Sequence, residues 1–163
     1  MANQDDAAIA PYYRGWDRFE VELVTAIGAL SAEQLALRPN REMWSVGMLT
    51  THIVAARAGW FHGWMGHGPS ALSRLTEWDE NEEPTRTAPE LVAALAETWA
   101  MVDDGLKTWT AAEIDETFKS PSNHDRPLRS RQWIIWHVLE HDLRHGGEIS
   151  LILGMNGVKS LDF

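Results

Sequence analysis

Four long segments of the chain carry apolar residues three and four positions apart, and this spacing limits the fold more than any other feature. The segments run from about Ile9 to Leu30, from Ser45 to Met65, from Thr87 to Trp109 and from Arg129 to Leu153. Apolar residues at this spacing fall on one face of an α-helix. We find no convincing strand pattern beside them. The sequence therefore predicts an all-α protein without a sheet, most economically a four-helix bundle.

Helix-capping residues mark several ends of these segments. Ser45 is a predicted N-cap for the second helix. Capping boxes, with Ser or Thr followed three residues later by Glu or Gln, lie at 31–34, 87–90 and 110–113. The first and last boxes predict short helices within the connections. Because two connections are long, we expect long crossovers rather than tight turns, and we predict that the acidic stretch at 77–83 is a solvated loop.

Length and charge narrow the class of protein. A chain of 163 residues with 44% apolar residues suits a single domain, residues 1–163, with its own core. A formal net charge of −10 argues against nucleic acid as a partner. The chain has neither an apolar run of about 18 residues nor the build of a signal peptide at its start, so we expect a cytoplasmic protein without membrane contact. It has no cysteine, so a metal would need imidazole and carboxylate ligands.

The last segment carries three histidines at four-residue spacing, His137, His141 and His145. With Glu148 they share a sector of about 80° on the helix. The other positions are largely apolar, which predicts a buried helix with one polar stripe. Burying imidazoles costs free energy unless each nitrogen finds a partner. Two histidines four residues apart on a helix can chelate one divalent ion, which is such a partner.

A third ligand is predicted on the second helix at His52, which stands among small and apolar residues. Three imidazoles would leave coordination positions open for water or substrate. Two other interpretations stay open: a lone core histidine is usually only hydrogen-bonded, and the whole group could be a metal-free histidine network. We interpret His62, His67 and His124 as structural or exposed.

Two motifs resemble the DinB-like superfamily, also called DinB/YfiT-like, whose members are regarded as metal-dependent enzymes. The first is Trp44-Ser45-Val46 leading into His52, and the second is EHDLRHGGE at 140–148. Members typically have a Trp-Ser helix start with one histidine after it. A late H-x-x-x-H follows, with a Gly and a polar residue beyond it. The order and spacing of elements agree along the whole chain, although only these two motifs are specific.

The resemblance implies a bundle with two long crossovers and frequent homodimers. It also implies that His52, His141 and His145 hold nickel or zinc. His137 matches no required ligand and becomes an additional pocket residue. Gly146 stands where many members have Arg, which puts a substrate contact at that position in doubt.

We therefore expect a metal-dependent enzyme acting on a small-molecule substrate, either a hydrolase or a transferase that uses an external low-molecular-weight thiol, as some relatives do. The catalytic candidates are Glu148, Arg144 and His137. Glu148 or Asp142 could orient a ligand imidazole through its second nitrogen, and Arg144 could meet an anionic substrate or be an ordinary surface residue. The rival hypothesis is a non-enzymatic metal-binding or stress-response protein whose metal only staples two helices together.

Overall fold

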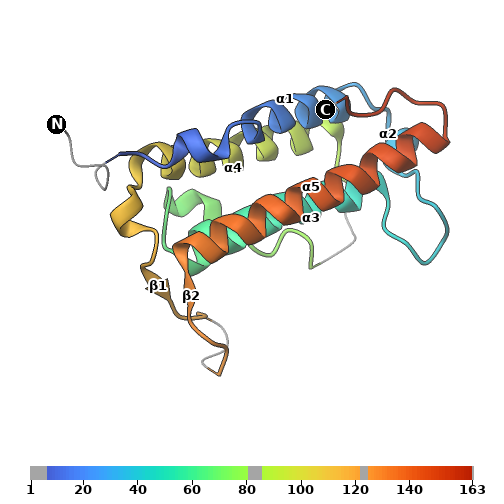
Figure 1. The fold of residues 1–163 in the computed structure, drawn as a ribbon. Helices are drawn as coiled ribbons and strands as arrows, with labels where there is room; N and C mark the ends of the chain where they lie inside the picture. Colours follow the sequence, from blue (N-terminus) through green and yellow to red (C-terminus); the bar gives the residue numbers. More distant parts are fainter. Residues whose placement is uncertain (1–6, 81–85, 122–124, 163) are drawn as a thin grey trace.

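The computed structural model describes residues 7–80, 86–121 and 125–162. Its four long helices are α1 (Trp16–Gly28), α3 (Val46–Arg57), α4 (Ala88–Thr108) and α5 (Arg131–Met155). In Figure 1, α1 lies beside α4 in one layer, and α3 lies beside α5 in the other. Helix α4 also packs on α3. The predicted helical bundle is confirmed.

The connections explain why this bundle has crossovers. The neighbours around the bundle follow the order α1, α4, α3, α5. The chain therefore passes between diagonally opposite helices twice, from α1 to α3 and from α4 to α5 (Figure 1). The connections hold the short elements α2 (Ala32–Leu35), η4 (Ser70–Leu75) and η5 (Ala111–Glu113).

One small antiparallel pair of strands was not predicted. Strands β1 (Thr117–Phe118) and β2 (Arg129–Ser130) pair with Thr117 opposite Ser130, directly before α5. The prediction that the chain has no sheet is wrong at this point. Two residues per strand are too few to give an alternating pattern in the sequence.

The first predicted helix is broken. It begins as the 3₁₀ turn η2 (Ala10–Tyr13), and α1 starts only at Trp16. Gly15 between them has φ +105°, a left-handed conformation that glycine adopts readily and that interrupts a helix. The second predicted helix is regular through Arg57 and then continues as a π-helix, η3 (Ala58–Trp64).

The predicted caps are confirmed. The hydroxyl of Ser45 accepts a hydrogen bond from the Met48 N–H at 3.2 Å, and this fixes the start of the helix that carries His52. Both contacts of a capping box are present where α2, α4 and η5 begin. Local sequence therefore determines where most of these elements start.

The core is built from the predicted apolar stripes. The stripe residues of α1, for example Leu23 and Ile27, are fully buried. Helix α5 differs from the prediction of a buried helix, because Trp136 is 60% and Leu143 is 48% exposed. Helix α5 packs chiefly on α3, with further contacts to α1, η3 and β2. None of the described helices is apolar over a length that could cross a membrane.

Candidate metal centre

Helices α3 and α5 face each other in opposite directions. His52, in the middle of α3, contacts His141 and His145 in the middle of α5, whereas Trp60 in η3 contacts Trp133 near the start of α5. The two helices are therefore antiparallel, and each supplies side chains to a shared cluster of histidines.

His52, His141 and His145 converge on one point. The Nε2 atoms of His52 and His141 are 2.9 Å apart. One nitrogen from each of the three residues lies within 4.8 Å of the others. Two Zn–N bonds of about 2.0–2.1 Å span at most about 4.2 Å, so only a small adjustment separates this cluster from a ligand set. The structure thus brings together the three histidines that the sequence singled out.

Two carboxylates fix the orientation of two of these rings. Asp79 accepts a hydrogen bond from Nδ1 of His52, and Glu148 accepts one from Nδ1 of His145 at 2.9 Å. With their protons on Nδ1, both imidazoles direct an Nε2 lone pair away from the carboxylates. Metal-bound histidines in proteins are usually held in this way through their second nitrogen.

His141 differs from the other two histidines in the surroundings of its Nδ1 atom and in its pKa. Its Nδ1 atom is buried and has no hydrogen-bond partner among the described residues. Burial lowers the pKa of its imidazole to about 3, and repulsion from His145, His52 and His137 adds to the effect. A neutral imidazole is the form that binds a metal ion. The donor set and its protonation therefore fit a divalent cation with nitrogen ligands.

The other predicted site residues lie around this cluster in different ways. The Arg144 side chain is 65% exposed, and its Nε lies 3.7 Å from a Glu148 oxygen. His137 stacks on Trp133 with ring centroids 4.8 Å apart, outside the triad, and burial lowers its pKa. Asp142 does not orient a histidine, contrary to one of the two options in the prediction, because its carboxylate points to Arg57 and Trp16.

Two residues at the site were not assigned from the sequence. Asp79 lies in the acidic stretch predicted to be a solvated loop, yet its carboxylate holds His52. Nothing in the local pattern marks this aspartate among its acidic neighbours. Trp44 belongs to the Trp-Ser motif, and its ring stands edge-on to His52 at 4.7 Å and lies 6.1 Å from His145.

His62 and His67 lie outside the cluster and contact backbone carbonyls instead. His62 Nδ1 lies 3.3 Å from the His67 carbonyl, and His67 Nε2 lies 3.2 Å from the Met101 carbonyl. These contacts agree with the structural role predicted for both. His124 lies outside the described residues.

A cavity of about 600 Å³ opens beside His52 and Asp79. Its wall is mostly apolar, and it also includes the two basic residues Arg38 and Arg86. Cavities of this size and character hold small organic ligands. Among the lining residues, Trp44 and Asp79 contact His52, which itself lines the cavity.

Comparison with known proteins identifies the family of the chain. The model of the DinB superfamily matches residues 15–149. The chain belongs to the DinB superfamily. No curated protein matches it significantly.

Two solved structures have the same fold. A DinB-like protein from Bacillus cereus aligns with a TM-score of 0.73 at 13% identity, over 97% of this chain and 99% of that one. A DinB-like protein from Bacillus subtilis aligns with a TM-score of 0.61 at 16% identity, over 95% of each chain. At such low identity the agreement concerns the fold alone.

Proposed function

We propose that this DinB-superfamily protein is a metal-dependent enzyme whose divalent cation, zinc or nickel, is held by His52, His141 and His145. The observation that carries the proposal is the convergence of three imidazole nitrogens within 4.8 Å. Asp79 and Glu148 on the second nitrogens of two of these rings give further support. A histidine that served only for packing would not need a carboxylate on Nδ1 that leaves the Nε2 lone pair free for a metal ion.

The substrate is a small molecule that occupies the cavity beside His52. A cation on three imidazoles supplies Lewis acidity and lowers the pKa of a bound water or thiol. The chain supplies the rest: Asp79 and Glu148 hold two rings in place, and the largely apolar cavity beside His52 offers space for the substrate. Because the chain has no cysteine, a thiol-dependent reaction would take its thiol from an external low-molecular-weight compound.

Metal analysis of purified, untagged protein tests the proposal first. We expect one zinc or nickel ion per chain in the native protein and none in the His141→Ala variant, with helical circular dichroism retained in both. A panel of hydrolysable esters and amides, and of thiols paired with electrophiles, then tests turnover with and without metal. Native protein that takes up neither zinc nor nickel would refute the proposed site.

The non-enzymatic alternative, a metal that only joins α3 to α5, differs in coordination. A structural site is usually closed by a fourth protein ligand, whereas a catalytic site keeps a position for water. Asp79 and Glu148 both point to ring nitrogens of the triad. Because both carboxylates already bind ring nitrogens, neither is placed as a fourth metal ligand, which favours a catalytic site with an open coordination position.

We also propose that the protein forms a homodimer, as the family resemblance implies. Supporting it, Trp136, Leu143, Leu151 and Met155 are exposed on one side of α5. Sedimentation should give twice the mass of the chain, and Leu151→Glu should shift the protein toward monomer.

A further inference from the structure

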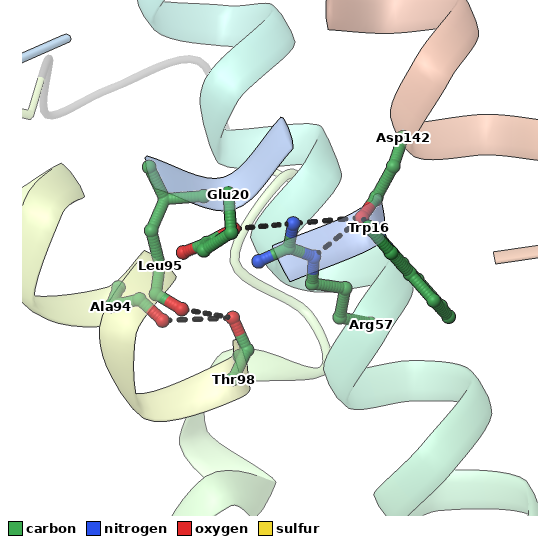
Figure 2. Close-up of polar contacts among 7 residues, drawn as sticks. All are labelled: Trp16, Glu20, Arg57, Ala94, Leu95, Thr98 and Asp142. Atoms are coloured by element: carbon green, nitrogen blue, oxygen red, sulfur yellow. Dashed lines mark hydrogen bonds and ion pairs between the residues drawn. The ribbon is translucent and has the colours of Figure 1, made fainter. Parts of the chain in front are cut away.

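A buried ionic network lies directly beside the histidine cluster and takes no part in it. Arg57, fully buried at the end of α3, lies between Glu20 of α1 and Asp142 of α5 (Figure 2). Its Nη2 is 2.7 Å from an oxygen of each carboxylate, and its Nε donates to Asp142 at 2.9 Å. The indole N–H of Trp16 donates to the same Asp142 oxygen at 2.8 Å.

The network joins three helices. Helix α4 adds no charge there among the described residues: its buried Thr98 donates to carbonyls of its own helix, those of Ala94 and Leu95 (Figure 2). The Asp142 carboxylate is thus bound to α3 through Arg57 and to α1 through Trp16. A rotation of α5 that carries the Asp142 carboxylate out of hydrogen-bond range would break both contacts.

Stability alone does not account for this network. Glu20 and Asp142 are both buried, so their charged forms are costly despite the guanidinium. Glu20 Oε1, Arg57 Nη1 and Asp142 Oδ1 have no hydrogen-bond partner among the described residues. Apolar residues of similar volume often stabilise a fold as well as, or better than, a buried ion network. In some proteins such a network instead specifies one arrangement of the elements that it joins.

The position of the network indicates which arrangement it specifies. Asp142 follows His141 directly and precedes His145 by three residues. Arg57 follows His52 by five residues on α3, about 7.5 Å along the helix axis. Consecutive helical residues differ by about 100° in direction. The contacts of Asp142 with Arg57 and Trp16 therefore set the direction in which His141 and His145 point.

We propose that Arg57 and Asp142, supported by Glu20 and Trp16, are positioning residues that fix the rotation of α5 against α3 so that His141 and His145 meet His52. This inference rests on the proposed function, because it gives the network a role in metal affinity. It assigns these residues no contact with the metal or the substrate.

The test replaces the network by neutral side chains in the triple variant Glu20→Gln, Arg57→Met, Asp142→Leu. We expect thermal stability to be kept or increased, while Zn²⁺ affinity, measured by titration with a competing chelator, falls at least about tenfold. The absorption spectrum of the Co²⁺-loaded protein should also change. A structural role alone would change stability and leave the affinity and the spectrum as they are.

The matched control lies on the same helix. Arg131 at the start of α5 is also buried and pairs with Glu116 at 2.6 Å, far along the helix from the triad. Arg131→Met with Glu116→Gln should leave the Zn²⁺ affinity unchanged. If this control lowers the affinity as much as the triple variant does, or if the triple variant binds Zn²⁺ normally, the inference is wrong.

Two further measurements keep the outcome interpretable. If the triple variant does not fold, the single variant Asp142→Asn replaces it. Asparagine keeps the shape of the aspartate side chain but weakens its interaction with Arg57. If the native chain binds neither Zn²⁺ nor Ni²⁺, the proposed function fails. Positioning is then judged in crystals of the metal-free variant, where a retained His52–His141 separation of 2.9 Å would overturn it.

Discussion

At the scale of single residues, the three histidines of the candidate site differ in what surrounds their second nitrogen. Carboxylates accept hydrogen bonds from Nδ1 of His52 and of His145, whereas Nδ1 of His141 is buried and has no hydrogen-bond partner among the described residues. The two carboxylates therefore tune ring orientation, and the protein interior keeps the third ring neutral. These differences lead to separate predictions for Glu148 and for His141.

Glu148→Gln should reduce turnover more than it reduces metal content. Glutamine keeps an oxygen that can accept a hydrogen bond from the His145 Nδ1–H group. It removes the negative charge that strengthens this hydrogen bond. The side chain is 41% exposed, so the fold should tolerate the change. Metal content by elemental analysis and the kcat of the active panel substrate give the comparison. Equal loss of both would mean that Glu148 serves only to retain the metal.

The metal-free protein should become less stable as the pH falls below about 6.5, the ordinary range of a histidine pKa. In the folded protein the pKa of His141 is lowered to about 3, so between these values only the unfolded chain binds the proton. The stability from neutral His141 is thus complete above the unfolded pKa and is lost as the pH falls through this range. Urea unfolding of chelator-treated protein measures it. A His141→Gln variant should show a flatter dependence, and an unchanged slope would contradict the assignment.

At the scale of secondary-structure elements, the contact between α5 and α1 requires a glycine. A Cβ atom at Gly146 would lie 2.5 Å from Cε2 of Phe19, a ring that is 2% exposed. The neighbouring Gly147 has open space around its Cβ position. Gly146 therefore permits close packing of the helix that carries two of the histidines, and a larger residue there would require α1 to move.

Gly146→Ala should destabilise the protein by about 1–3 kcal/mol, the usual cost of overpacking. Gly147→Ala is the matched control, and it should be neutral or stabilise by up to about 1 kcal/mol because alanine favours a helix. Chemical denaturation of both variants gives the comparison. Similar free energies of unfolding for the two would show that α1 and α5 are not in close contact at Gly146.

Sequence reasoning located the helices because their signals are local. Apolar spacing and capping residues act within a few positions, so Ser45 could be recognised as a cap without knowledge of the fold. The histidines of α5 were found for the same reason. The positions of Asp79 and Arg57 depend on which helices become neighbours, and no local pattern encodes that. The break at Gly15 was missed because the apolar spacing continues across it.

At the scale of the whole molecule, the bundle has a core that does not depend on a metal. The apolar stripes of its four long helices are packed against one another on the inside, and the triad lies at one point between α3 and α5. A metal at this point would therefore add stability by binding the native state rather than by creating the fold.

Removal of the metal should lower the melting temperature only moderately. At a free metal concentration 100 times Kd, binding adds about 2.7 kcal/mol to the stability. For a chain of this size, 1 kcal/mol corresponds to about 2–4 °C, so chelation should lower Tm by about 5–11 °C. Thermal scans by circular dichroism, with metal and with chelator, measure the shift, and His141→Ala should melt near the chelated native protein. A chelated protein that is already unfolded at about 25 °C, and whose metal form shows no response to substrates or thiols, would establish the metal as a staple between α3 and α5.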